Sequence, residues 1–217
     1  MARPKTPILS KPAIRAAALA VIDRDGLEKL SMRKLAQELD VRAASLYSHY
    51  GNKDELLAEI SDEVTADIDV SGFDQDWREG LARWARSYRD ALTRHPNLVP
   101  VAAAGPGRRE EALRRADAVH GGLVGAGWPP KQATMIGASA KYLIVGAATQ
   151  SFARGFDDDV RVYRDRYPNL TQAHRLPEHA SEIDDASFEL ALTAFLDGLE
   201  GLFAQVTRGE SVGSGEI

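Results

Sequence analysis

The sequence has no cysteine, which excludes disulfide bonds, thiolate zinc sites and cysteine nucleophiles. Its first residues, "MARPKTPILSKP", include basic side chains but no apolar run long enough for a signal peptide, so we expect a cytoplasmic protein. With 44% hydrophobic and 27% charged residues in 217 positions, the composition is that of an ordinary globular protein.

Long hydrophobic runs are also scarce, and only residues 132–153 raise the question of a membrane span. This segment carries a single charge, Lys141, near its middle. A lysine at the centre of a bilayer costs roughly 2.5 to 3.5 kcal/mol, and the neighbouring Gln, Ser and Thr side chains add to that cost. We therefore expect a buried helix and no membrane partner.

Acidic residues are few in the first quarter of the chain. Residues 1–53 contain 10 Lys or Arg and 5 Asp or Glu, a net charge of +5. Because the whole chain carries −5, residues 54–217 carry −10. A basic head joined to an acidic remainder indicates an anionic polymer as the partner of the head, and nucleic acid is the leading candidate.

The chain reads as helical almost throughout, without a convincing period-2 strand pattern. Ser10 is a suitable N-cap for a first helix that stops at Gly26. Ser31 is expected to begin a second helix that runs through Leu39.

Two further helix boundaries follow from local signals. A third short helix is expected over about 43–50 and ends at Gly51, a residue suited to the left-handed C-terminal cap. Asn52 as N-cap and Glu55 in the first turn predict a fourth helix over residues 53–69.

Two short helices joined by a tight turn and followed by a longer helix form the pattern of a helix-turn-helix unit. Its core is expected to contain Leu35, Leu39, Val41 and Leu46. The intervening polar side chains would then point outward. By geometry alone, a plain helical hairpin with a solvated polar face explains the pattern equally well.

The run "LSMRKLAQELDVRAASLYSHYGNKDELL" (30–57) resembles the DNA-binding domain of the tetracycline-repressor (TetR) family. In that family a leucine-alanine pair, a short turn, "LY-x-H" and "NK-x-x-LL" recur in this order and spacing. The stretches "FDQDWREGLARWARSYRDALTRHPNLV" (73–99) and "FELALTAFLDGLEGLF" (188–203) are similar to the C-terminal domain of the tetracycline-repressor branch.

The resemblance implies an all-α fold, with an N-terminal three-helix helix-turn-helix DNA-binding domain and a C-terminal helical ligand-binding and dimerisation domain. We place the DNA-binding domain at residues 1–52, including a basic arm at 1–10. The effector-binding and dimerisation domain is placed at 53–208, and a disordered tail at 209–217.

The resemblance also implies which residues contact DNA, within a helix-turn-helix from about Ser31 to Tyr50. The matching positions are Arg33, Ala43, Ser45, Tyr47, Ser48, His49 and Lys53. Arg33 matches a residue that reaches a base edge, where an arginine can bond guanine through two hydrogen bonds. A phosphate contact is the alternative for this residue.

The other matching positions divide by role. Ser45 and Ser48 match groove-facing positions, although small hydroxyls read bases less decisively than longer side chains. Tyr47, His49 and Lys53 match residues that hold the phosphate backbone, which positions a protein without reading sequence.

Departures from the tetracycline repressor indicate a different operator. Ala43 stands where that protein has a base-reading glutamine, and Ser48 where it has a tryptophan. Arg42 and the arm at 1–10 are candidates for compensating contacts, with solvated charges as the alternative. Tyr50 is expected to belong to the core.

A helix-turn-helix protein that reads palindromic half-sites needs a two-fold partner. Apolar residues of the last helix recur at spacings of 4 and 3, a seam suited to another helix. The expected homodimer interface residues are Phe188, Leu192, Phe195, Leu199 and Leu202. Residues 132–153 would supply the second interface helix of a four-helix bundle. The alternative is that both stripes fill the protomer's own core.

The family pattern implies an effector cavity in the helical domain. Ala102 stands where the tetracycline repressor has a metal-binding histidine, and Ala118 where it has a ligand-bonding glutamine. We therefore expect no metal and no cofactor, and a small, largely apolar or aromatic effector. The residues expected to contact it are Trp84, Tyr88, Met135, Ser139 and Tyr142. Each is individually more often a core residue.

The resulting hypothesis is a transcriptional repressor, released from a palindromic double-stranded DNA operator by a small molecule. The alternatives are a constitutive architectural DNA-binding protein and, more distantly, an all-α enzyme. The acidic run at 157–159 is expected to be a solvated loop, and the histidines show no spacing with carboxylates that would build a metal or acid–base site. We therefore expect no enzymatic activity.

Overall fold

The computed structural model describes residues 9–105 and 109–208, and every regular element in these ranges is helical. The expected basic arm, apart from its last two residues, and the expected tail lie outside the described residues. The α-helices are α1 (Lys11–Asp25), α2 (Met32–Glu38), α3 (Ala43–Tyr47), α4 (Lys53–Val64), α5 (Trp77–Thr93), α6 (Val99–Ala103), α7 (Glu110–Gly125), α8 (Pro130–Thr149) and α9 (Ala180–Thr207). The 3-10 turns are η1 (Leu27–Lys29), η2 (Ser71–Asp74), η3 (Pro96–Leu98), η4 (Ala153–Gly155), η5 (Val160–Val162) and η6 (Ala173–Arg175). The all-α prediction is confirmed.

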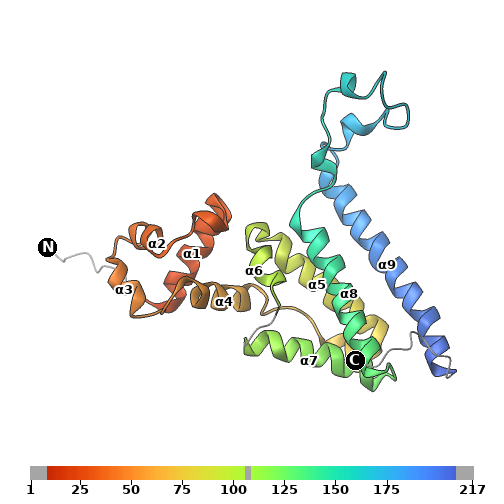
Figure 1. The fold of residues 1–217 in the computed structure, drawn as a ribbon, viewed down its shortest axis with the longest axis horizontal. Coiled ribbons are helices and arrows are strands. Elements are labelled where there is room, and N and C mark those ends of the chain that lie inside the picture. The colour runs from red at the N-terminus through yellow and green to blue at the C-terminus, as the bar shows by residue number, and fades with distance from the viewer. Residues whose placement is uncertain (1–8, 106–108, 209–217) are drawn as a thin grey trace.

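The helices form two apolar cores. The first is built by α1 to α4 together with Leu98. The second lies among α5, α7, α8 and α9 and includes Trp77, Trp84 and Trp128. Figure 1 shows the first four helices at one end of the molecule and the longer C-terminal helices at the other. Among the described helices, none is long and apolar enough to cross a bilayer.

The predicted caps of the first two helices are present. The Ser10 hydroxyl accepts a hydrogen bond from the Ala13 amide at 3.3 Å, and the Ser31 hydroxyl accepts one from the Lys34 amide at 3.1 Å. Gly26 follows α1 with a φ of 90°, a conformation that glycine adopts at little cost. These boundaries were predictable because each depends on a side chain and the backbone beside it.

The turn between α2 and α3 depends on Asp40, whose φ is 51°. The Asp40 amide bonds the Gln37 carbonyl at 3.2 Å, and the Val41 amide bonds the Ala36 carbonyl at 2.9 Å. This pair of bonds is the Schellman arrangement that ends a helix through one left-handed residue. Aspartate tolerates that conformation better than most side chains, so it can make the turn without glycine.

The third helix differs from the prediction, because it ends at Tyr47 rather than near Tyr50. The Ser48 hydroxyl donates a hydrogen bond to the Ser45 carbonyl at 2.7 Å, and the chain then turns so that the Tyr50 side chain is fully buried. Gly51 does not have the positive φ that the predicted cap required. The prediction that Tyr50 belongs to the core is confirmed. Its burial ends the helix before the glycine that the sequence suggested as the cap.

The fourth helix begins as predicted but ends at Val64, not at residue 69. Asn52 accepts a hydrogen bond from the Glu55 amide at 2.8 Å. Near the other end, the Thr65 hydroxyl donates to the Ser61 carbonyl at 2.6 Å. Such a bond competes with the backbone ladder and favours an end at this point.

In its packing, α4 belongs with the N-terminal helices rather than with the domain to which the sequence assigned it. Leu56, Leu57 and Ile60 are buried in the first core. The expected domain boundary after residue 52 therefore separates α4 from the N-terminal helices against which it packs.

Glu59, on α4, is the centre of a polar cluster that fastens this helix to α1. Its carboxylate accepts hydrogen bonds from Lys11 at 2.6 Å, Arg15 at 3.0 Å and the Tyr50 hydroxyl at 2.9 Å. Arg15 also pairs with Glu63. Burial alone would raise the pKa of Glu59, but the bonds from Lys11 and Tyr50 outweigh it, and the pKa lies below its ordinary value.

In the C-terminal domain, α5 packs between α7, α8 and α9. Its arginines pair with acidic residues of α9, among them Arg86 with Glu189 at 2.8 Å and Arg89 with Asp185 at 2.7 Å. The segment between α8 and α9 projects beyond the helices, as Figure 1 shows, and contains the turns η4, η5 and η6.

We expect the backbone of Asp40 to govern the stability of the helix-turn-helix. Asp40→Val should lower the free energy of unfolding by about 1 to 2 kcal/mol, because a β-branched residue is strained at positive φ. Asp40→Gly should stay within about 1 kcal/mol of the wild type. Thermal unfolding of both variants measures this difference. Equal stability of the two variants would contradict the assigned turn.

We expect Glu59→Gln to lower the free energy of unfolding by about 1 to 2 kcal/mol at pH 7, because bonds to a charged acceptor are lost. A carboxyl with a lowered pKa in the folded state stabilises above its ordinary pKa, 4.5, and loses that contribution as the pH falls through the lower folded value. The difference between variant and wild type should therefore shrink below about pH 4.5, as urea denaturation at two pH values can measure.

The matched control for that measurement is Glu63→Gln on the same helix. Glu63 is more exposed and pairs only with Arg15 among the described residues. Its loss should cost no more than about 0.5 kcal/mol. Equal effects of the two substitutions would show that the cluster is not centred on Glu59.

Candidate functional site

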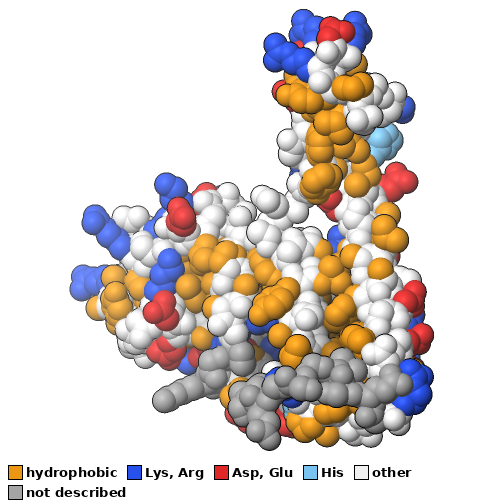
Figure 2. Space-filling view, turned by 45° about the vertical axis from the view of Figure 1, so that its right-hand side comes forward, with side chains coloured by type: hydrophobic (Ala, Val, Ile, Leu, Met, Phe, Trp, Pro, Cys, Tyr) orange, Lys and Arg blue, Asp and Glu red, His pale blue; other side chains and the backbone are white. Residues whose placement is uncertain are grey.

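The helix-turn-helix presents a polar surface at the end of the molecule. Its exposed side chains include Arg33, Arg42, Ser45, Tyr47 and Ser48. Figure 2 shows Lys and Arg side chains projecting from this end. The structure thus brings most of the predicted DNA-contacting residues to one accessible surface.

Ala43, His49 and Lys53 complete the predicted set and are half-buried. The Lys53 ammonium donates a hydrogen bond to the Leu27 carbonyl at 3.2 Å, which fixes the side chain beside the start of α4. Two of its three donors remain for another acceptor.

The cations of this surface differ in whether a carboxylate already neutralises them. Arg24 pairs with Asp25 at 3.1 Å, and Lys34 pairs with the same carboxylate. Arg33 and Arg42 have no ion-pair partner in the described part of the chain. These two guanidinium groups are therefore available to an external anion such as a phosphate.

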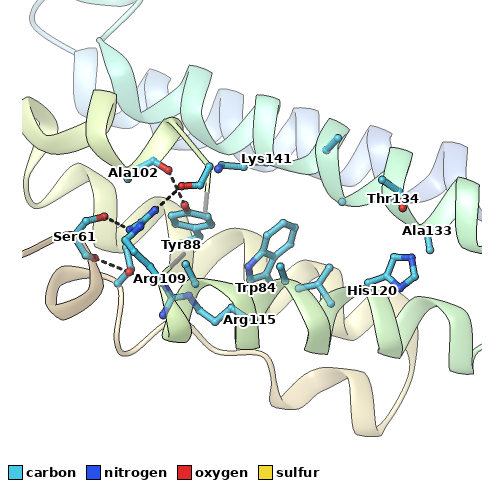
Figure 3. Close-up of a pocket in the computed structure, with 17 residues that line it drawn as sticks. Ser61, Trp84, Tyr88, Ala102, Arg109, Arg115, His120, Ala133, Thr134 and Lys141 are labelled. Carbon is cyan, nitrogen blue, oxygen red and sulfur yellow. Dashed lines mark hydrogen bonds between the residues drawn. The ribbon is translucent and has the colours of Figure 1, made fainter. Parts of the chain in front are cut away.

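A cavity of about 410 Å³ lies inside the C-terminal domain, and Figure 3 shows the residues that line it. Trp84 and Tyr88 of α5 form one wall, and residues of α7 and α8 form the others. Val119 and several alanines add apolar surface to the lining. This volume is in the range of small-molecule sites.

The structure brings only part of the predicted effector set to this cavity. Trp84 and Tyr88 line it, as does Ala102, whose carbonyl accepts a hydrogen bond from the Tyr88 hydroxyl at 3.5 Å. Met135, Ser139 and Tyr142 do not. Their side chains lie on the outer face of α8, where Met135 is 57% and Tyr142 75% exposed.

Sequence reasoning missed the polar groups of the cavity. Arg109, Arg115 and Lys141 lie near one end and His120 lies toward the other, as Figure 3 shows. A signal for Lys141 was present, because it is the single charge in residues 132–153. Arg115 gave a weaker signal, an arginine on the same helical face as small and apolar residues.

The cavity reaches α4, the helix that the N-terminal core shares. Ser61 and Thr65, near the C-terminal end of α4, line the cavity. The Arg109 guanidinium donates to the Ser61 hydroxyl at 2.8 Å, and Arg115 donates to the Thr65 hydroxyl at 2.7 Å. The same helix therefore contacts the cavity at one end and the helix-turn-helix along its length.

The predicted dimer seam of α9 mostly faces inward. Phe188, Leu192 and Leu199 are between 1 and 6% exposed and belong to the protomer's own core. Phe195 packs partly against the same core, and Leu202 is 38% exposed. This corrects the interface assignment for the three buried residues, because side chains already covered within the protomer contribute little new buried area.

A different face of α9 is exposed and composed of small and apolar residues. It contains Leu190, which is 73% exposed, together with Ala194, Gly198, Gly201 and Leu202. A Cβ atom added at Gly198 or Gly201 would meet no atom of the protomer within 4 Å. The outer face of α8, with Met135, Ser139 and Tyr142, is exposed as well, and α8 packs against α9.

Two family models match the chain. The model described as "Bacterial regulatory proteins, tetR family" matches residues 14–60. The model described as "Tetracyclin repressor-like, C-terminal domain" matches residues 73–203. Together they cover most residues of both cores.

Curated relatives agree with the models. An HTH-type transcriptional regulator of Saccharopolyspora erythraea is 32% identical over 146 residues, which span 66% of this chain and 61% of that protein. The class A tetracycline repressor protein from transposon 1721 of Escherichia coli is 31% identical over 194 residues, 84% of this chain and 87% of that protein. The HTH-type transcriptional repressor DrrR1 of Streptomyces coeruleorubidus is 30% identical, over 94% of this chain and 82% of that protein.

Solved structures share the fold. A possible TetR family transcriptional regulator from Streptomyces coelicolor superposes with a TM-score of 0.73 and is 30% identical, covering 89% of this chain and 100% of that one. ActR of the same species, in complex with (S)-DNPA, superposes with a TM-score of 0.69 and is 29% identical, covering 89% of this chain and 98% of that one.

Proposed function

The chain belongs to the TetR family of bacterial regulatory proteins, and we propose that it is a homodimeric transcriptional repressor that a small molecule releases from a double-stranded DNA operator. Relatives of similar length are named repressors, and the related ActR has been crystallised with a small molecule. The exposed helix-turn-helix and the cavity are the two sites that such a protein needs.

The observation that carries the proposal is the position of α4. Leu56 and Ile60 fix this helix in the core of the helix-turn-helix, while Ser61 and Thr65 form part of the cavity wall. A ligand in the cavity therefore contacts the element that orients the DNA-binding surface. A constitutive architectural DNA-binding protein would need neither the cavity nor this connection.

At the DNA surface, we propose that Arg33 reads a base or holds a phosphate at the start of α2. Tyr47, His49 and Lys53 would hold the phosphate backbone on either side of α3. Ser45, Ser48 and Ala43 would face the groove, where short side chains give little discrimination between bases. The affinity for DNA would then depend more on contacts to phosphates than on contacts to base edges.

Release requires two states of the protein with different affinities for the effector. We propose that in one state the two helix-turn-helix units of the dimer lie at the spacing of successive major grooves. The effector would bind better to a second state, in which α4 has moved and the spacing no longer fits. Linkage then lowers the affinity for DNA by the same factor by which DNA lowers the affinity for the effector.

We propose that two copies pair through the outer faces of α8 and α9. These faces carry exposed apolar residues such as Leu190 and Tyr142, with glycines that let two helices approach closely. Figure 2 shows apolar side chains over this part of the molecule. The proposed interface replaces the one expected from the sequence. Of the expected residues, Leu202 lies on the proposed face and Phe195 at its edge.

We propose that the chain acts by binding rather than by catalysis and that it works in the cytoplasm, where its DNA lies. Its curated relatives are named as regulators and repressors. The division into a DNA-binding module and a module for effector binding and dimerisation also stays a proposal, with α4 as the helix between them.

The DNA-binding proposal is tested by Arg33→Ala. A duplex selected by the wild-type protein from random DNA serves as the probe in a gel-shift assay. The variant should bind it about ten- to a hundredfold more weakly, because a specific arginine contact is worth about 1 to 3 kcal/mol. Tyr47→Phe should weaken binding by the same factor for every DNA sequence, since it removes one contact to a phosphate and none to a base.

The matched control is Arg114→Ala, which removes an exposed arginine of α7, outside the helix-turn-helix. It should leave DNA binding within about twofold of the wild type. Unchanged binding by Arg33→Ala and Tyr47→Phe, with folding intact by circular dichroism, would refute the assigned surface.

The dimer proposal is tested by Leu190→Glu. A carboxylate buried at the interface should raise the dimer dissociation constant at least about tenfold, since 1.4 kcal/mol corresponds to a factor of ten. Analytical ultracentrifugation measures the constant. Leu113→Glu is the control, because Leu113 is also exposed, at 46%, but lies on α7. A dimer unaffected by Leu190→Glu would exclude this face of α9.

A further inference from the structure

The cavity has a strongly basic end. Arg109, Arg115 and Lys141 approach it from the segment before α7, from α7 itself and from α8. Figure 3 shows these side chains near Tyr88, beside the wall that α4 contributes. Three cations from three parts of the chain thus converge on one side of a small volume.

Few carboxylates balance these cations. Asp62 pairs with Arg109 at 3.3 Å, and Arg115 donates to the neutral hydroxyl of Thr65. Within residues 9–105 and 109–208, Lys141 has no hydrogen-bond or ion-pair partner. The basic end therefore has an excess of positive charge.

Burial of these cations carries an electrostatic cost. Burial, together with the charge of Arg109, lowers the pKa of the Lys141 ammonium. Burial also lowers the pKa of the Arg115 guanidinium, although the nearby Asp62 carboxylate acts in the opposite direction. An anion placed between these groups would relieve the repulsion and replace part of the hydration that burial removes.

The rest of the cavity is suited to an apolar body. Trp84 lies between the basic end and the end that contains His120, and Val119 and Ala133 contribute further apolar surface. A small inorganic anion would leave this surface empty. A neutral hydrocarbon would leave the cations without a counter-charge.

We propose that the effector is an amphipathic organic acid, with an aromatic or polycyclic body against Trp84 and a carboxylate bound by Arg115 and Lys141. This inference rests on the proposed function and names the chemical class of its ligand. It keeps the aromatic body of the expected effector and adds an anionic group, because an apolar body accounts for only part of the cavity lining. An arginine fork and a lysine together match the geometry and the charge of a carboxylate.

The same contacts explain how an acid would reach the DNA-binding domain. Arg109 and Arg115 are the residues that hold the end of α4, through Ser61, Asp62 and Thr65. A carboxylate in the cavity competes for the guanidinium groups with the hydroxyls of Ser61 and Thr65, which are weaker acceptors, and with the Asp62 carboxylate. Acid binding therefore weakens the hydrogen bonds from these arginines to α4. Conversely, stronger hydrogen bonds to α4 would weaken acid binding.

The test uses matched pairs of compounds that differ in charge but hardly in shape. Benzoate, 2-naphthoate and anthraquinone-2-carboxylate are each compared with the corresponding carboxamide by isothermal titration calorimetry on the full-length dimer. At least one acid should bind tenfold or more tightly than its carboxamide. The same acid should release the selected duplex in the gel-shift assay.

Variants then locate the acid. Lys141→Gln and Arg115→Gln should each weaken acid binding about tenfold and weaken carboxamide binding by a smaller factor, because the carboxamide carries no charge. Lys131→Gln is the matched control, because it removes a lysine of α8 that does not line the cavity. It should leave both affinities unchanged.

Thr65→Val tests the competition with α4. It removes the hydroxyl that accepts from Arg115 and keeps the size of the side chain. If the carboxylate competes for this arginine, the variant should bind the acid more tightly than the wild type does. Unchanged or weaker acid binding would overturn the coupling.

The remaining outcomes separate this inference from the proposed function. If a carboxamide binds and releases DNA as well as its acid, the inference is wrong and the repressor proposal stands. If no acid in the panel binds, or if the acid preference persists in Lys141→Gln and Arg115→Gln, the inference is also wrong. If the wild-type protein selects no DNA, the proposed function fails, while an acid preference in calorimetry would still support the assigned ligand class.

Discussion

The whole arrangement depends on α4, a helix of twelve residues that has partners on both sides. Glu59 binds α1 and Tyr50 through charged hydrogen bonds, and one turn later Asp62 and Thr65 bind the two arginines of the cavity. A hydrogen-bonded helix of this length moves as a unit. A displacement at the cavity end is therefore passed to the base of the helix-turn-helix without any intermediate loop.

The parts of the fold that were predictable from sequence are those that local chemistry determines. Ser10, Ser31 and Asn52 cap their helices because each hydroxyl or amide satisfies a backbone amide a few residues away. The end of α3 was not predictable in the same way. Tyr50 leaves the helical path to reach Glu59 on the next helix, a tertiary contact that the capping signals do not encode.

The candidate sites likewise depend on tertiary packing as well as on local signals. The sequence alone also does not fix which face of a helix points inward. Spacing identifies that a stripe exists, but two adjacent stripes of one helix can both look apolar. On α8, the sequence predicts Met135 and Tyr142 at the cavity, whereas Lys141, one residue from Tyr142, lines it. On α9 the stripe through Phe188 faces the core, and the smaller residues around Leu190 remain exposed. The direction of each stripe is decided by the neighbouring helices.

The strength of the contacts at the cavity fits the task of a switch. A hydrogen bond to a charged group contributes about 1.5 to 3 kcal/mol, and couplings between ligand sites are typically about 1 to 3 kcal/mol. Exchange of one or two acceptors at Arg109 and Arg115 is therefore enough to change DNA affinity substantially. Stronger pairing of these arginines with α4 would hold one state so firmly that no ligand could compete. Thr65 offers only a hydroxyl and Asp62 only a single contact at 3.3 Å, so the hold on α4 is firm enough to orient the helix and weak enough to be displaced.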